Sequence, residues 1–277
     1  MELLTTVAEM AAARDRVHRP LGLFPTMGSL HDGHLALVDQ ALRDNTTVAV
    51  SIFVNPTQFG PSEDFEAYPR DMERDLGLLK ERGVHLVFAP SVEEMYPNGY
   101  SSYVDVQGIT DRLEGERRPG HFSGVATVVT KLFTIVRPDR SYWGQKDGQQ
   151  VAVIKRLNRD LNLGVDIVVV PTVRESDGLA MSSRNVYLTD MERRTAPVLY
   201  RALSYVRDLW EKGQCDAGLL RREMVRMIGS EPLARLDYVS VADPDTLEEL
   251  EIADVPALVS VAAWFSKTRL IDNDVLI

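Results

Sequence analysis

Cysteine is almost absent from this chain of 277 residues, with Cys215 as its single example. One thiol cannot form a disulfide within the chain, and it cannot supply the paired cysteines of a structural zinc site. The chain also contains no apolar run close to the roughly 18 residues that a membrane helix needs. The opening MELLTTVAEM shows no basic start followed by an apolar core, so we expect no signal peptide. These absences favour a cytoplasmic enzyme or binding protein.

An excess of positive charge is lacking as well. The 31 Lys and Arg residues stand against 41 Asp and Glu residues, which gives a formal net charge of −10. Nucleic-acid binding requires net or clustered cationic surface, so this balance disfavours a nucleic-acid partner. It is compatible with a small anionic substrate, because a cationic cleft can lie within an acidic protein.

The common phosphate-binding and zinc-binding motifs are missing too. No G-x-G-x-x-G or H-E-x-x-H is present. The stretch GERRPGHF (115–122) has the glycine spacing of a P-loop, but His121 and Phe122 stand where that loop needs lysine and a hydroxyl residue. His18 and His85 are isolated. A zinc enzyme is therefore disfavoured, and phosphate binding would have to use another arrangement.

Between residues 20 and 173 the chain does contain a regular alternation of strand-like and helix-like segments. This alternation predicts an α/β fold with a Rossmann-like parallel sheet wrapped by helices. Strands are predicted at 21–24, 46–54, 84–90, 141–144 and 165–173, and helices at 33–45, 71–83, 122–138 and 149–164.

The pattern changes after about residue 175. One long helix is predicted at 189–213, opened by a capping box at Thr189 and Glu192, and a second helix around 216–229. Strands are predicted near 236–242, 257–263 and 269–271. We therefore expect a larger domain at 1–174 and a smaller α+β domain at 175–277, joined near 174–180.

The stretch FPTMGSLHDGH (24–34) is the most informative part of the chain. It follows a predicted strand and enters a helix, which is where open parallel sheets bind ligands. The first turn of a helix leaves N–H groups unpaired and attracts phosphate. His31 and His34 lie on the same side of that turn, where two imidazoles could stabilise charge in phosphoryl transfer. Two surface histidines beside a turn are the alternative interpretation.

Three more polar segments follow predicted strands. Asn55 and Gln58 come after the second strand, in a stretch (51–71) whose remainder is polar and typical of a mobile lid. Lys146 and Gln150 follow the fourth strand, and MSSRN (181–185) follows the fifth. Taken alone, the Asn55 segment is equally compatible with an ordinary turn, and an ordinary surface position is the better interpretation of the other two. Together they favour one site, because unrelated polar residues on the surface would not recur at successive strand ends of one sheet.

These segments resemble the pantoate–β-alanine ligase (pantothenate synthetase) family, within the HxGH nucleotidyltransferase superfamily. The resemblance extends from about residue 20 to 273. It is carried by PTMGSLHDGHLAL, SIFVNPTQFGPSEDFEAYPRD, LEGERRPGHFSGV, GQKDGQQ, PTVRESDGLAMSSRNVYL and TRLIDN, in that order. The first motif alone indicates nucleotidyltransferases in general, and the six together indicate this family.

The resemblance implies a ligase that condenses pantoate with β-alanine, using ATP and forming a pantoyl adenylate. It implies Mg²⁺ accompanying ATP as a substrate, no tightly bound cofactor, a C-terminal domain that closes over the site, and a homodimer formed through the N-terminal domains. The chemistry fits the residue types, because an ionised carboxylate needs orientation and charge neutralisation rather than a strong base.

The resemblance also assigns roles to residues. His34, His31, Lys146 and Arg184 are the catalytic candidates, with His34 in the position that the family assigns as proton donor. Pantoate and β-alanine contacts are expected from Gln58, Gln150 and Asn55, and no residue is assigned as a metal ligand. ATP contacts are expected from Met27, Gly28, Ser29, Leu30, His31, Asp32, Gly33, His34, Gly144, Gln145, Lys146, Asp147, Val173, Met181, Ser182, Ser183 and Arg184.

Three positions depart from the family pattern. Gln145 stands where glutamate is usual, Gly148 where an aromatic residue is usual, and Ser266 where glycine is usual. None of them removes a proposed catalytic group, and Gly148 is expected to weaken the start of its helix by roughly 1 kcal/mol. Two alternative functions stay open: a nucleotidyltransferase that makes a dinucleotide, and a catalytically silent nucleotide-binding protein.

Overall fold

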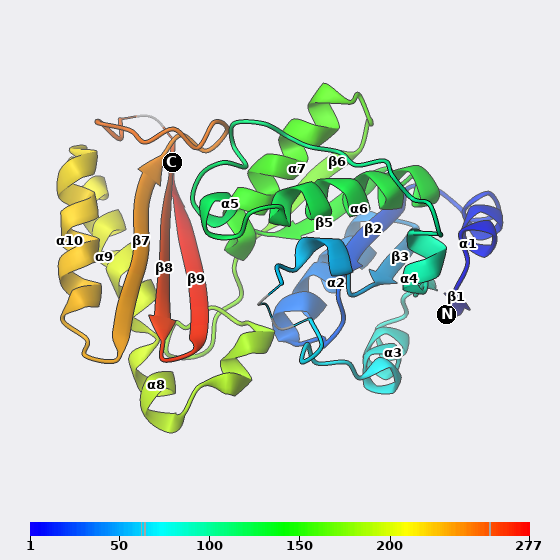
Figure 1. Cartoon of the computed structure of the whole chain (residues 1–277), viewed down its shortest axis with the longest axis horizontal. Coiled ribbons are helices and arrows are strands. Elements are labelled where there is room, and N and C mark those ends of the chain that lie inside the picture. Colours follow the sequence, from blue (N-terminus) through cyan, green and yellow to red (C-terminus); the bar gives the residue numbers. More distant parts are fainter. Residues whose placement is uncertain (62, 64, 255) are drawn as a thin grey trace. The chain divides into compact units, whose positions relative to one another are not determined.

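The computed structural model describes every residue of the chain except Ser62, Asp64 and Val255 (Figure 1). Ser62 and Asp64 belong to the stretch predicted as a lid and lie outside the described residues. The described chain contains a six-stranded parallel sheet and a three-stranded antiparallel sheet. The predicted fold class, a Rossmann-like parallel sheet with a smaller α+β part, is confirmed.

The parallel sheet has the strand order β1-β4-β3-β2-β5-β6. Its strands are β1 (Glu2–Leu4), β2 (Leu21–Thr26), β3 (Thr47–Ile52), β4 (Leu86–Phe88), β5 (Arg140–Gly144) and β6 (Asp166–Val170). All five neighbouring pairs are parallel, so every strand ends at the same edge of the sheet. The four segments predicted to bind ligand follow β3, β2, β5 and β6, which are consecutive in the sheet.

The order of the strands reverses at β2, because the chain builds outward to β3 and β4 on one side and to β5 and β6 on the other. Such a switch point is the usual ligand crevice of an open α/β sheet. Here β2 pairs with β3 as far as Thr26, whereas its pairing with β5 stops at Leu23 and Ser141. The hydrogen-bonded ladder between β2 and β5 is thus open at its carboxyl end.

Helices cover this sheet on both faces. Buried residues of β2 and β3, such as Phe24, Val48 and Val50, form one core with α2, and the intervening Leu23 and Ala49 are fully buried as well. Burial on both faces explains the nearly continuous apolar strands. The helices of this part are α1 (Val7–Arg14), α2 (Asp32–Asp44), α3 (Met72–Glu81), α4 (Val92–Met95), α5 (Glu114–Arg117), α6 (His121–Val136) and α7 (Gly148–Asp160), with the 3₁₀ turn η1 (Pro56–Gln58).

The C-terminal part packs two helices against one antiparallel sheet, β7-β8-β9 (Figure 1). Leu203 and Val206 of α9, Leu220 and Met224 of α10, and Val261 of β8 are among its core residues, all almost fully buried. The elements are η2 (Gln145–Asp147), η3 (Ser183–Tyr187), α8 (Asp190–Thr195), α9 (Val198–Glu211), α10 (Ala217–Gly229), β7 (Ala234–Ala242), β8 (Ala257–Phe265) and β9 (Thr268–Leu276).

The prediction of one long helix at 189–213 is wrong. The segment forms two helices, α8 and α9, which are separated at Ala196 and Pro197. Proline has no N–H and its ring clashes with the carbonyl four residues earlier, so it cannot continue α8, but its carbonyl can start α9. Arg201 accordingly donates its N–H to the Pro197 carbonyl at 3.0 Å. The predicted capping box of Thr189 and Glu192 is present.

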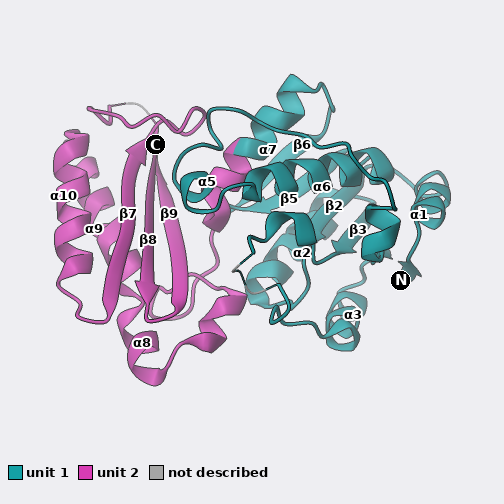
Figure 2. Ribbon diagram, viewed as in Figure 1, with its two compact units in different colours: residues 1–144, 153–170 teal, residues 145–152, 171–277 magenta. Residues whose placement is uncertain are grey.

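The chain divides into two compact units (Figure 2). Unit 1 contains residues 1–144 and 153–170, and unit 2 contains residues 145–152 and 171–277. The short segment 145–152, which carries Lys146, is thus grouped with the C-terminal residues. The domain limits expected from the sequence, 1–174 and 175–277, stay a prediction.

Among the described residues, none of the helices combines the length and the apolar character that crossing a bilayer would require.

Candidate active site

His31 and His34 together cap the N-terminus of α2. His31 is the N-cap residue, and its Nδ1 accepts the Gly33 N–H at 3.1 Å. The backbone N–H of His31 in turn donates to His34 Nδ1 at 3.4 Å. The two rings stack with their centroids 3.9 Å apart. This is a capping box built from imidazoles, where serine, threonine and acidic residues are the usual choice.

The capping hydrogen bonds fix which nitrogen of each ring carries the proton. Since Nδ1 of His31 and Nδ1 of His34 both act as acceptors, each neutral ring holds its hydrogen on Nε2. An Nε2–H group donates a hydrogen bond to an anion without giving up its proton. The geometry therefore suits both histidines to electrostatic stabilisation rather than to proton release.

The loop before these histidines is held by Asp75, a residue that the sequence analysis did not single out. Its carboxylate is 1% exposed and accepts the N–H groups of Ser29 at 2.7 Å and Leu30 at 2.9 Å. Arg74 donates to the Leu30 carbonyl at 2.9 Å. Gly28 and Ser29 have φ of +84° and +54°, a conformation that costs serine about 1 kcal/mol. Asp75 compensates for that cost, and it occupies the N–H groups of Ser29 and Leu30, two residues that were expected to contact ATP.

Gln58 joins the second predicted segment to the first. Its Nε2 donates to the sulfur of Met27 at 3.3 Å, and its Oε1 accepts from Asn55 Nδ2 at 3.1 Å. Asn55 is 1% exposed, donates also to the Gly124 carbonyl and accepts from the Tyr96 hydroxyl at 2.8 Å. Asn55 therefore orients Gln58, and its expected contact with substrate stays a prediction.

A second group that the sequence analysis did not assign holds the backbone of Gln58. Arg118 forms a two-pronged ion pair with Glu63, at 2.6 and 2.8 Å. Arg118 also lies 3.1 Å from His121 Nε2, and His121 Nδ1 lies 2.9 Å from the Gln58 carbonyl. Because a guanidinium only donates, Nε2 is the acceptor and Nδ1–H donates to Gln58. Arg118 and His121 both lie in LEGERRPGHFSGV (113–125), one of the motifs that carry the family resemblance, so the sequence did contain a signal for them.

Burial, reinforced by the neighbouring Arg118 charge, lowers the pKa of His121 to about 4. The neutral ring is needed here because protonation at Nε2 would turn an acceptor for the guanidinium into a second positive group. His121 is consequently a neutral structural link between Arg118 and Gln58 at physiological pH.

In unit 2, the residues around Lys146 are held by β9. Asn273 donates its side-chain N–H to the Lys146 carbonyl at 2.7 Å and accepts from Gln145 Nε2 at 2.8 Å. The Lys146 ammonium lies 3.4 Å from Asp147. Gln150 lies in the first turn of α7 and is partly exposed.

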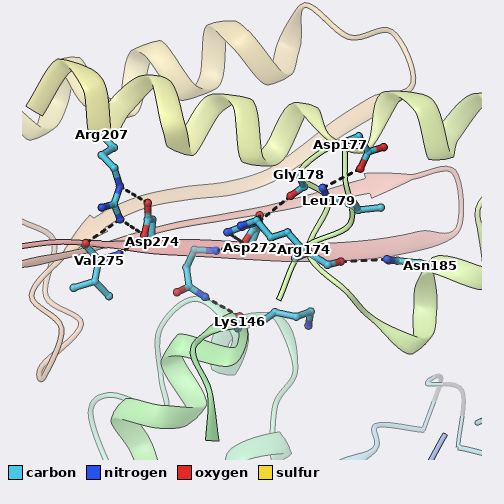
Figure 3. Close-up of polar contacts among 12 residues, drawn as sticks. Lys146, Arg174, Asp177, Gly178, Leu179, Asn185, Arg207, Asp272, Asp274 and Val275 are labelled. Atoms are coloured by element: carbon cyan, nitrogen blue, oxygen red, sulfur yellow. Dashed lines mark hydrogen bonds and ion pairs between the residues drawn. The ribbon is translucent and has the colours of Figure 1, made fainter. Parts of the chain in front are cut away.

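The remaining segments of unit 2 come together through a hairpin at 174–180. The Met181 N–H donates to the Val173 carbonyl at 3.0 Å, so the two ends of this hairpin are neighbours. Arg174 is paired with the buried Asp272 of β9 at 2.6 and 3.0 Å (Figure 3). Ser182 caps η3 by accepting the Arg184 N–H at 3.3 Å.

The predicted site residues are thus divided between the two units. Unit 1 contains Met27 to His34, Asn55, Gln58 and Gly144. Unit 2 contains Gln145, Lys146, Asp147, Gln150, Val173 and Met181 to Arg184. Among the residues that the structure describes, no three His, Cys, Asp or Glu side chains are arranged to hold a metal ion.

Comparison with known proteins gives one consistent result. The model of the family described as pantoate-beta-alanine ligase matches residues 2–275. The pantothenate synthetase of Chloroflexus aurantiacus is 59% identical over 274 residues, which is 99% of this chain and 97% of that protein.

Two solved structures are similar over nearly the whole chain. Pantothenate synthetase from Thermus thermophilus is 52% identical with a TM-score of 0.95, and the match covers 99% of both chains. The Francisella tularensis pantoate-beta-alanine ligase, complexed with beta-gamma ATP and beta-alanine, is 34% identical with a TM-score of 0.81, covering 99% of this chain and 97% of that one.

The depressed pKa of His121 predicts a loss of stability in mild acid. In the unfolded chain His121 takes up a proton near pH 6.5, and in the folded chain only near pH 4. The contribution of the neutral ring to the free energy of unfolding is therefore complete above pH 6.5 and is lost as the pH falls from 6.5 toward 4. Between pH 7 and 5 the group should remove about 2 kcal/mol from the free energy of unfolding, measured by urea denaturation.

The matched variant is His121→Asn, whose amide N–H can replace Nδ1–H but does not titrate. Its free energy of unfolding should fall less between pH 7 and pH 5 than that of the unmodified protein. Equal losses in the two proteins would contradict the assigned role of His121.

Proposed function

The chain belongs to the pantoate–beta-alanine ligase family, and we propose that its two groups of donor residues carry out the ATP-dependent condensation of pantoate with β-alanine. The pantoate carboxylate attacks the α-phosphorus of ATP and displaces pyrophosphate, which gives pantoyl adenylate. The β-alanine amine then attacks the acyl carbon and displaces AMP. The observation that carries the proposal is the pair of stacked histidines at the N-terminus of α2, at the switch point of a parallel sheet.

In the first step, unit 1 supplies the groups that face the reacting phosphate. Negative charge accumulates on the α-phosphate as the carboxylate attacks. His34 and His31 donate Nε2–H to its oxygens, beside the positive end of the α2 dipole. The remaining N–H groups of the 27–34 loop and Gly144 border the nucleotide. Because pantoate is already ionised, no general base is needed.

Gln58 binds pantoate in this proposal. Its amide is already oriented by Asn55 and Met27, and its backbone by His121. A preoriented neutral amide can bond both the hydroxyl and the carboxylate groups of pantoate at little further entropic cost. Asn55 supports Gln58, and Gln150 is the second pantoate contact.

Unit 2 supplies the cations. Lys146 and Arg184 neutralise the departing pyrophosphate, with Gln145 and Asp147 beside the lysine. Ser182, Ser183, Met181 and Val173 complete the nucleotide contacts. Support comes from the hairpin contact between Val173 and Met181, which brings two expected ATP segments together inside one unit. Magnesium enters with ATP and offsets phosphate charge.

Three further features belong to the proposal. The N-terminal part, to about residue 174, forms the nucleotide domain and a homodimer contact, and residues 175–277 form the smaller domain that closes over the site. The working location is the cytoplasm. Closure would shield the mixed anhydride from water, which otherwise hydrolyses it.

The reaction is tested with ATP, pantoate and β-alanine together and with each one omitted. Pantoate-dependent exchange of pyrophosphate into ATP, and AMP release that requires β-alanine, are the expected results. A dinucleotide product, or tight ATP binding without pyrophosphate release, would instead support one of the two alternatives named above.

His34→Ala removes one donor to the α-phosphate. Adenylation should fall about 10²–10³-fold, as when one oxyanion donor is lost, with little change in pantoate affinity. Pyrophosphate exchange measures this step. His34→Gln retains an N–H donor and should recover part of the rate, and His18→Ala, at an exposed histidine outside the site, is the control. An unchanged rate in His34→Ala would exclude the proposed role.

Gln58→Ala removes a hydrogen bond to pantoate. The pantoate KM should rise about tenfold while the ATP KM changes much less. Steady-state kinetics with each substrate varied gives both values. Gln40→Ala, at a glutamine of α2 that binds Asp44, is the matched control. An effect confined to the ATP KM would place Gln58 elsewhere.

A further inference from the structure

Asn273 makes an unusual pair of contacts for a residue near the C-terminus. Its side chain is 5% exposed and lies in β9. The Nδ2 group donates to the Lys146 carbonyl at 2.7 Å, and Oδ1 accepts from Gln145 Nε2 at 2.8 Å. One amide thus holds two consecutive residues that are far away in the chain. Both contacts lie inside unit 2.

The position of Gly148 shows how closely the lysine segment fits against this amide. A Cβ atom at residue 148 would lie 3.0 Å from Asn273 Oδ1, 3.1 Å from Cγ and 3.2 Å from Nδ2. These distances are shorter than normal van der Waals contact, and hydrogen bonds on both sides of the amide prevent it from moving away. A Cβ atom at 148 would therefore displace the lysine segment by a few tenths of an ångström relative to Asn273.

The anchor itself is rigid. Asn273 pairs with Ser260 of the central strand β8, within a ladder that runs the whole length of β9. The preceding residue, Asp272, is buried and holds Arg174 through two hydrogen bonds (Figure 3). Two adjacent residues of β9 thus fix two separate segments. One is the lysine segment, and the other is the 174–180 hairpin, which lies between the proposed ATP contacts Val173 and Met181.

The lysine segment connects β5 to α7, and its own regular structure is short. Residues Gln145–Asp147 form a single 3₁₀ turn, which is too short to be stable alone. We propose that Asn273 is the positioning residue for Lys146: it sets where the backbone of Lys146 lies, and so where the ammonium group meets the phosphates. This inference depends on the proposed role of Lys146 in phosphate binding.

The direct test is Asn273→Asp, which replaces the donor facing the Lys146 carbonyl by an oxygen but retains the acceptor for Gln145. Pantoate-dependent pyrophosphate exchange should slow about tenfold, with the pantoate KM within about twofold of the unmodified value. Hydrogen exchange of the peptide that contains residues 145–152 should accelerate.

The matched control for loss of stability is Asn158→Asp. Asn158 likewise donates its amide to a carbonyl, that of Val165, at 2.8 Å, and accepts from the Val165 N–H. Both variants should have a lower Tm, but only Asn273→Asp should slow adenylation. Equal effects of the two variants on the rate, or no effect of Asn273→Asp, would overturn the inference.

A second variant approaches the same contact from the other side. Gly148→Ala leaves Asn273 unchanged but crowds its amide, so adenylation should again slow, although alanine is the better helix former. Gly77→Ala, at a helical glycine whose Cβ would meet nothing within 4 Å, should retain full activity. A fully active Gly148→Ala would show that Asn273 can shift without displacing Lys146, which contradicts the proposal.

Lys146→Ala separates failure of this inference from failure of the proposed function. If Lys146→Ala slows adenylation and Asn273→Asp does not, Asn273 is not the positioning residue although the lysine role stands. If Lys146→Ala leaves adenylation unchanged, the lysine role itself is wrong, and the inference fails with it.

Discussion

The parallel register of β3, β2 and β5 is the constraint on which the proposed chemistry of unit 1 depends. Parallel pairing brings the carboxyl ends of these strands to one edge, so the histidine loop and the Gln58 turn emerge side by side. The ladder between β2 and β5 stops at Leu23 and Ser141, before either strand ends. The sheet thereby provides a fixed edge and an opening at the switch point, and the loops supply the reactive groups.

Loops cannot hold such groups accurately by themselves, and buried polar side chains compensate for this here. Asp75 binds the backbone of the histidine loop, and Asn55 with His121 binds Gln58. In unit 2, Asp272 binds Arg174 of the hairpin, and Asn273 binds the backbone of the lysine segment. Each buried group has protein partners, as it must to offset its desolvation. The residues proposed for chemistry are thus supported by residues that need not touch a substrate.

Much of the fold was predictable, because the periodicity of apolar residues and the positions of turn residues can be read from short stretches of sequence. The strands from β2 to β6 and the helix after the histidines were expected close to their observed positions. The short β1 and α1 escaped notice, since three residues of strand carry too little pattern, and Pro197 was overlooked inside the helical stretch 189–213. Candidate residues with distinctive chemistry were recognised by motif, whereas Asp75, Arg118, His121 and Asn273 were not assigned, because their roles depend on distant partners.

The sequence by itself determined the family, the alternation of strands and helices, and the identity of the donor groups, because all three are encoded in local order along the chain. Tertiary structure alone decided that Asp75 holds the histidine loop, that His121 holds the backbone of Gln58, and which strand holds Lys146. Those properties arise from contacts between segments as far apart as Lys146 and Asn273. Such contacts exist only once the sheets have formed and brought the segments within hydrogen-bonding distance.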